Sequence, residues 1–159
     1  MHMMNDYFET LTAEEKAVYS ALAEYAFSLG YKAKKDKTKT LSYTFIHPRV
    51  KQRILRFSSD KGKPVVKLKF FASQSYTPYF HEAIRTVIEE YNYRYTGCYG
   101  CGTCDGTHGY TYKYPDGREY YRCGTELIDL SGVTEDLLPE IFLLLQKQHQ
   151  YYLDVLPQE

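Results

Sequence analysis

The sequence has no tryptophan, no long apolar run and no cysteine outside residues 98–123. No apolar stretch approaches the roughly 20 residues that a membrane-spanning helix needs, and the first residues lack the basic, apolar and small-residue pattern of a secretory signal peptide. We therefore expect a cytoplasmic protein without a membrane partner. Residues 1–3 read Met-His-Met, as a cloning remnant would, so residues 4–159 are predicted to form a single domain.

Several patterns of catalytic and nucleotide-binding proteins are also missing. The sequence contains no phosphate-binding loop, no recognisable Ser/His/Asp arrangement and no pair of acidic residues at a spacing typical of hydrolases. His47, His81 and His149 have no identifiable partner for acid–base chemistry, so we interpret them as surface or core-edge residues. These absences favour a binding or regulatory role over catalysis.

Apolar residues at helical spacing predict three helices, over 13–29, 78–94 and 135–153. The first helix begins at a capping box made by Thr12 and Glu15. The second has proline at its first position and is expected to bury Tyr91 along its apolar stripe.

Alternating apolar and polar residues predict strands over 41–47, 53–58, 64–72 and near 126–130. In the third strand Lys67 and Lys69 alternate with apolar residues, so one face of the sheet is expected to be apolar and the opposite face basic. Together the elements predict an α+β fold. It has a single antiparallel sheet of about five or six strands, three helices, and a cysteine loop joined to a β-hairpin.

Positive charge is concentrated in one part of a chain whose net charge is zero. Between Lys32 and Lys69 there are 13 Lys or Arg residues and only two Asp residues. Such a segment can form a face that attracts phosphates, and nucleic acid or another anion is then a candidate partner. The candidate anion-binding residues are Lys34, Lys35, Lys37, Arg56, Lys67 and Lys69. The alternative is an ordinary solvated sheet face that the acidic helices neutralise.

All four cysteines belong to one motif, Cys98, Cys101, Cys104 and Cys123. Three thiols at a spacing of three residues, set among glycines, with a fourth thiol further on, are typical of a tetrathiolate metal site. Four sulfur ligands complete a tetrahedron around zinc and leave no open position for catalysis. The sequence therefore predicts a zinc-stabilised domain with a structural four-cysteine site.

A β-hairpin is predicted to return the fourth thiol to the other three. Pro115, Asp116 and Gly117 suit a three-residue loop with glycine at the left-handed position. Counting outward from this loop places Cys123 opposite Gly109, and a two-residue turn would place it opposite the next residue.

Other interpretations of the cysteines remain open at this point. CxxCxxC with a distant fourth cysteine also suits a [4Fe–4S] cluster. Cys101 and Cys104 are spaced like a redox-active dithiol, although no helix is predicted to follow them. His108 is a substitute ligand for one sulfur, in a site of three cysteines and one histidine, and four reduced thiols without a ligand are the last alternative.

Tyr110, Tyr112 and Tyr114 alternate along the first hairpin strand and share one face. Such a face either stacks bases of a single-stranded nucleic acid or packs against a helix, and we favour packing.

The run CxxCxxC followed by GYxYxYPDGRxYYRCG is similar to that of a family of small, uncharacterised bacterial cytosolic proteins. The resemblance implies a stand-alone bacterial domain in which the four cysteines are the motif positions. It leaves the choice of metal open and implies no activity.

Overall fold

The computed structural model describes residues 2–73, 75–97, 109–124 and 127–155. The helical elements are η1 (His2–Met4), α1 (Asn5–Phe8), α2 (Ala13–Ser28), α3 (Pro78–Tyr93), η2 (Glu135–Leu137) and α4 (Leu138–Val155). The strands are β1 (Lys32–Lys35), β2 (Tyr43–Ile46), β3 (Arg53–Asp60), β4 (Lys63–Leu68), β5 (Gly109–Lys113), β6 (Glu119–Cys123) and β7 (Ile128–Leu130). The predicted α+β class and its three long helices are confirmed. No helix in the described ranges is both long and apolar enough to cross a membrane.

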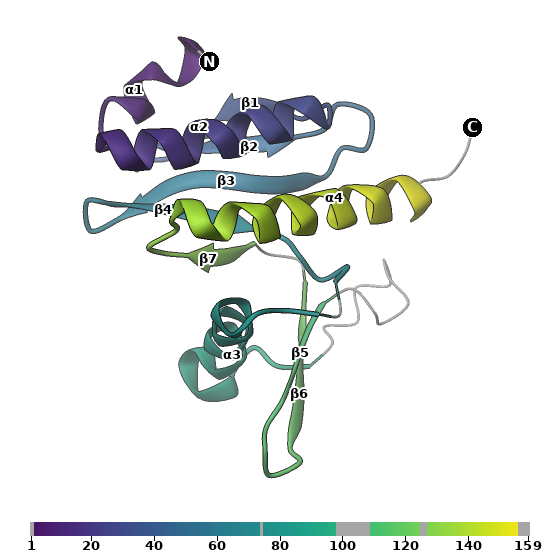
Figure 1. The fold of residues 1–159 in the computed structure, drawn as a ribbon. Coiled ribbons are helices and arrows are strands. Elements are labelled where there is room, and N and C mark those ends of the chain that lie inside the picture. Colours follow the sequence, from purple (N-terminus) through teal and green to yellow (C-terminus); the bar gives the residue numbers. More distant parts are fainter. Residues whose placement is uncertain (1, 74, 98–108, 125–126, 156–159) are drawn as a thin grey trace.

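The main sheet has five antiparallel strands in the order β1-β2-β3-β4-β7, and β5 and β6 pair with each other in a separate two-stranded sheet. Figure 1 shows α2 and α4 lying across the same face of the main sheet, while α3 and the hairpin lie beyond its β7 edge. The predicted meander is thus confirmed and extended by β1. The hairpin stands apart from the main sheet and packs against α3.

The first long helix follows its sequence signals closely. The backbone N–H of Glu15 donates to the Thr12 side chain at 3.2 Å, and the backbone N–H of Thr12 donates to the Glu15 carboxylate at 2.8 Å. This reciprocal pair satisfies two N–H groups that the first turn leaves without helical partners. The helix stops before Gly30, whose φ of +96° is a left-handed conformation that glycine adopts without strain.

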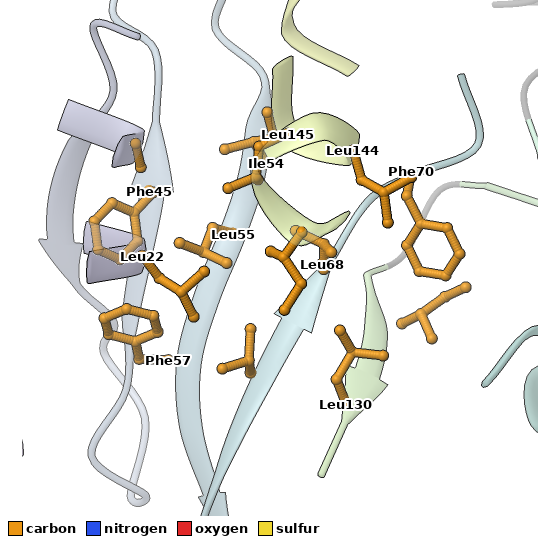
Figure 2. Close-up of a cluster of buried hydrophobic side chains, with 14 of the residues drawn as sticks. Leu22, Phe45, Ile54, Leu55, Phe57, Leu68, Phe70, Leu130, Leu144 and Leu145 are labelled. Carbon is orange, nitrogen blue, oxygen red and sulfur yellow. The ribbon is translucent and has the colours of Figure 1, made fainter. Parts of the chain in front are cut away.

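The hydrophobic core fills the space between the sheet and its two covering helices (Figure 2). At its β1 end the core is aromatic: the Phe57 ring stacks on Tyr7 at 5.7 Å and meets Phe45 edge-on at 5.0 Å. Met4 and Tyr7 come from the first short helices, which the sequence pattern did not reveal, and both are buried. That residues 1–3 are a cloning remnant stays a prediction.

A β-bulge changes which side chains of β3 face the core. The pairing of β2 with β3 shifts between Phe45 and Ile46, so Phe45 lies opposite Leu55 and Ile46 lies opposite Arg53. The extra residue is Ile54, which is buried with Leu55 and faces α4 (Figure 2). Strict alternation would have turned Ile54 away from the core.

The second long helix is interrupted by a kink near its C-terminal end. Glu90, Tyr91 and Asn92 have non-helical backbone angles, and the last two have positive φ. Tyr91 is therefore rotated off the buried stripe and is 69% exposed. The prediction that it packs in the core is wrong, because the helical period on which it rests stops at the preceding residue.

Two histidines and a tyrosine meet where α2 ends and α4 passes the β2–β3 turn. The rings of His47 and His149 are 5.5 Å apart, and the Tyr31 ring meets both edge-on. The Tyr31 hydroxyl lies 3.1 Å from Nδ1 of His149. Nδ1 of His47 accepts from the backbone N–H groups of Arg49 and Val50, each at 3.2 Å. Protonating that nitrogen would break both hydrogen bonds.

This cluster predicts a loss of stability in mild acid. Burial lowers the pKa of His47 and of His149, and the Arg49 charge and the neighbouring imidazole lower these two pKa values further. The unfolded chain then takes up protons near pH 6.5 before the native protein does, so the free energy of unfolding falls as the pH drops below about 6.5. Urea unfolding at pH 5.5, 6.5 and 7.5 measures this slope.

The double substitution His47→Asn and His149→Gln should flatten that slope, since asparagine keeps an acceptor for the two backbone N–H groups. His81→Gln is the matched control, because His81 is exposed on α3. If the free energy of unfolding depended on pH equally in the double variant and the wild type, the loss of stability in acid could not be assigned to these two histidines.

Candidate metal centre

The hairpin that carries Cys123 forms in the predicted register. Gly109 pairs with Cys123, and Tyr114 donates its backbone N–H to the carbonyl oxygen of Arg118 at 2.8 Å. Gly117 has a φ of +93°, as the three-residue loop requires. Local turn chemistry thus sets the position of the fourth cysteine.

Both ends of the cysteine loop meet β6 next to Cys123. At the first end, Gly97 bridges to Arg122 and donates its backbone N–H to the carbonyl oxygen of Tyr121 at 2.6 Å. At the second end, Gly109 pairs with Cys123 itself. The cysteine loop therefore begins beside β6 at Gly97 and ends beside β6 at Gly109. Both glycines pair with β6 residues that are at most two positions from Cys123.

Cys123 is 6% exposed and contributes to the lining of a cleft of about 380 Å³ between α3, β6 and β7. Lys67, Glu90, Arg122 and Asp129 bring charges of both signs to this cleft. A buried thiol at the base of a hairpin is a suitable position for a structural metal ligand.

Arg122 fixes the hairpin to α3. Its guanidinium donates to the carbonyl oxygen of Val87 at 2.7 Å and to the carboxylate of Glu90 at 2.8 Å, and it lies over the Tyr95 ring at 5.2 Å. Because Arg122 directly precedes Cys123, these contacts also fix the backbone that carries the thiol. The sequence showed Arg122 beside the motif, but it contained no signal for the contact with α3.

Of the candidate ligands of the proposed metal site, the described residues include one thiol, that of Cys123. Cys98, Cys101, Cys104 and the substitute ligand His108 lie outside the described residues. Among the residues that are described, no three His, Cys, Asp or Glu side chains form a metal-binding group. Cys123 is the candidate ligand that the structure describes. One end of the loop with the other three thiols, Gly109, pairs with Cys123, and the other end, Gly97, bridges to the preceding residue Arg122.

Lys69 does not lie on the outward basic face. The chain leaves β4 after Leu68, and the Lys69 side chain is 7% exposed. Burial and the Arg53 charge lower the pKa of Lys69 to about 8, while the charge of Cys123 acts in the opposite direction. The expectation that Lys69 is exposed on a basic sheet face is wrong, because the alternation of β4 was extended past the end of the strand, whereas its part in anion binding stays a prediction.

The other candidate anion-binding residues lie near the surface, and three of them have acidic partners. Lys35 pairs with Asp6 at 2.9 Å, Arg56 lies 3.5 Å from Asp36, and Lys67 lies 3.5 Å from Asp129. Lys34 and Lys37 are both exposed. The acidic partners weaken the positive charge of the segment without cancelling it.

Tyr110 packs in the core and is 3% exposed, with its ring against Phe70 and Phe71. Tyr114 is half-buried and donates its hydroxyl to Glu89 of α3 at 2.6 Å. The hairpin tyrosines thus connect the hairpin to the body of the domain, which favours the packing interpretation over base stacking.

The fold and the site together define a small α+β domain whose cysteine loop begins and ends on a β-hairpin. No protein-family model matches the chain, and neither a curated protein nor a solved structure does so. The bacterial family resemblance in the motif stays a prediction.

Proposed function

We propose that the chain is a zinc-stabilised binding or regulatory domain in which Cys98, Cys101, Cys104 and Cys123 hold one structural zinc ion. The observation that carries this proposal is the closure of the loop on β6, where Gly97 bridges to Arg122 and Gly109 pairs with Cys123. Because both ends of the loop are held beside the buried thiol, less conformational entropy is lost when the loop's own thiols bind the same ion. Zinc prefers four-coordinate tetrahedral thiolate sites in this structural role.

Within this proposal the metal stabilises the hairpin and carries out no reaction. Four thiolates complete the coordination of zinc, so no position is left for water or substrate. The ion would join the loop to β6, and the Arg122 contacts with Val87 and Glu90 would pass that restraint on to α3. Binding of a macromolecular or anionic partner is then the function of the surrounding surface.

Elemental analysis of protein purified without added metal tests the proposal. One zinc per chain, lost on treatment with a strong chelator together with a fall in melting temperature, is the expected result. A chain without zinc whose melting temperature does not change in chelator would reject the site.

The same preparation separates the alternative chemistries. Iron with acid-labile sulfide, and absorbance near 400 nm after anaerobic purification, would show that the cysteines hold a [4Fe–4S] cluster instead of zinc. A reversible disulfide between Cys101 and Cys104 in a metal-free protein would show that these cysteines act as a redox dithiol and not as zinc ligands.

A further inference from the structure

Opposite the face that α2 and α4 cover, the main sheet carries a row of side chains that runs from strand to strand. The antiparallel register places Lys34 beside Thr44, Thr44 beside Arg56, Arg56 beside Lys67, and Lys67 beside Asp129. Side chains at paired positions share a face. We call this surface the open face, because the core residues of the same strands point to the other side.

The β3 bulge adds a further cation to the open face. Arg53 pairs with Ile46, which is two residues from Thr44 and therefore on the same side of β2. Arg53 is exposed, as are Lys32 and Lys34 of β1. Without the bulge Arg53 would point toward the core, so the irregularity places it beside the other cations.

Arg56 is held through its Nε, which also lies 3.5 Å from Asp36, and its two terminal NH2 groups are left for a ligand. Its Nε donates to the Thr44 hydroxyl at 2.9 Å, and the same hydroxyl donates to Asp36 at 2.7 Å. Within the described ranges the two terminal NH2 groups of Arg56 have no hydrogen-bond partner, whereas the side chain itself is oriented by Thr44. A fixed guanidinium with free terminal groups suits the oxygens of a phosphate.

We infer that the open face binds the phosphate backbone of nucleic acid without regard to sequence. Five cations (Lys32, Lys34, Arg53, Arg56 and Lys67) against Asp36 and Asp129 leave a local excess of about three positive charges. From β1 to β4 the row extends over about 14 Å at the usual spacing of strands, which corresponds to about four nucleotide steps of a strand. The row contains no aromatic side chain that could stack on bases, so phosphate contacts alone are expected.

The charge on the opposite surface of the molecule favours binding of nucleic acid through the open face. The outer sides of α2 and α4 are weakly acidic, with Glu14, Glu24 and Asp154 exposed and Glu15 and Glu140 half-buried, against exposed Lys16 and Lys147. A polyanion is therefore repelled by the helical side and attracted by the sheet side, even though the net charge of the chain is zero. This inference does not depend on the metal site, which involves other residues.

Fluorescence anisotropy with a labelled 20-base-pair DNA duplex and a labelled 20-nucleotide RNA, both of mixed sequence, tests the inference. Binding at 50 mM NaCl should weaken about 20- to 40-fold at 200 mM, as expected when about three phosphates are neutralised. The double variant Lys34→Glu, Arg53→Glu should lose at least 10-fold in affinity at 50 mM salt. Its dependence on salt should also become shallower.

The matched control is Lys16→Glu, Lys147→Glu, which changes the net charge equally at exposed positions on α2 and α4. It should bind within about threefold of the wild type. The neutral double variant Lys34→Gln, Arg53→Gln, together with circular dichroism of every variant, separates loss of binding from loss of folding.

No binding at 50 mM salt, or equal losses in both charge-reversal variants, would overturn the inference. Sedimentation with phosphatidylserine vesicles, but no binding of either oligonucleotide, would overturn it in favour of a membrane surface. Binding of nucleic acid by a chain without zinc would support this inference while rejecting the metal site, so the two proposals fail separately.

Discussion

Cys123→Ser is expected to lose the proposed zinc ion and to unfold about 8–16 °C below the wild type. The free energy of binding a structural zinc is at the same time free energy of folding, and loss of a metal belongs to the few changes that cost about 4 kcal/mol or more. In a domain of this size 1 kcal/mol corresponds to roughly 2–4 °C in melting temperature. The effect should be largest in the hairpin and α3, because the thiol is buried where these two elements join.

Differential scanning calorimetry with and without a strong chelator measures this effect. The wild type should fall to nearly the melting temperature of the variant when zinc is removed, whereas the variant should not respond to chelator or to added zinc. This lack of response separates loss of the ion from the cost of a serine hydroxyl at a buried position, and Cys123→Ala provides a second check without a polar atom. Thr111→Ser, exposed on β5, is the hairpin control. A variant that still holds one zinc per chain would show that the fourth ligand is another residue.

The hairpin could be predicted from sequence because every signal that forms it is local. Pro115 and Gly117 set the loop, and a loop of fixed length determines the pairing of the strands outward from it, as far as Gly109 and Cys123. The capping box at Thr12 and the start of α3 at Pro78 are local in the same sense. Elements whose cause lies within a few residues were therefore predicted within about one residue.

Features that depend on distant contacts were not visible in the sequence. Arg122 reaches Val87 across 35 positions of the chain, and nothing in the residues around it indicates that partner. Lys69 continues the polar alternation of β4, but it lies past the end of the strand and is buried. Ile54 faces the core because a bulge in β3 interrupts the two-residue period. In each case the tertiary arrangement overrides the local pattern.

The proposed metal site also combines features with local causes and features that depend on distant contacts. The ligand set was predicted from spacing, and the position of Cys123 was predicted from the turn. The contribution of Gly97, which fixes the other end of the loop through its pairing with β6, needed the structure. A bridge between residues so far apart in sequence leaves no periodic signal.

Gly109→Ala is expected to open the base of the hairpin, lowering the free energy of unfolding by about 3 kcal/mol and weakening the retention of zinc. A Cβ atom at Gly109 would lie 2.2 Å from the carbonyl oxygen of Arg122 and 2.7 Å from the Tyr121 ring. The first of these atoms belongs to the backbone of β6, so the clash is relieved only if the two strands separate beside Cys123. Overpacking in a tight site usually costs about 1–3 kcal/mol, and contact with backbone places this variant at the upper end.

Urea unfolding together with zinc retention during stepwise chelation tests the role of Gly109. Thr111→Ala is the matched control, because it lies two residues along the same strand and its side chain is exposed, so it should stay within about 1 kcal/mol of the wild type and release zinc at the same chelator concentration. Gly109→Ala should instead release zinc at a lower concentration, since the separated strands move one end of the loop away from Cys123. Loss of stability with unchanged zinc retention would mean that the hairpin base and the metal site are independent. If the variant kept both properties of the wild type, the close approach of Gly109 to β6 would have no part in holding the loop.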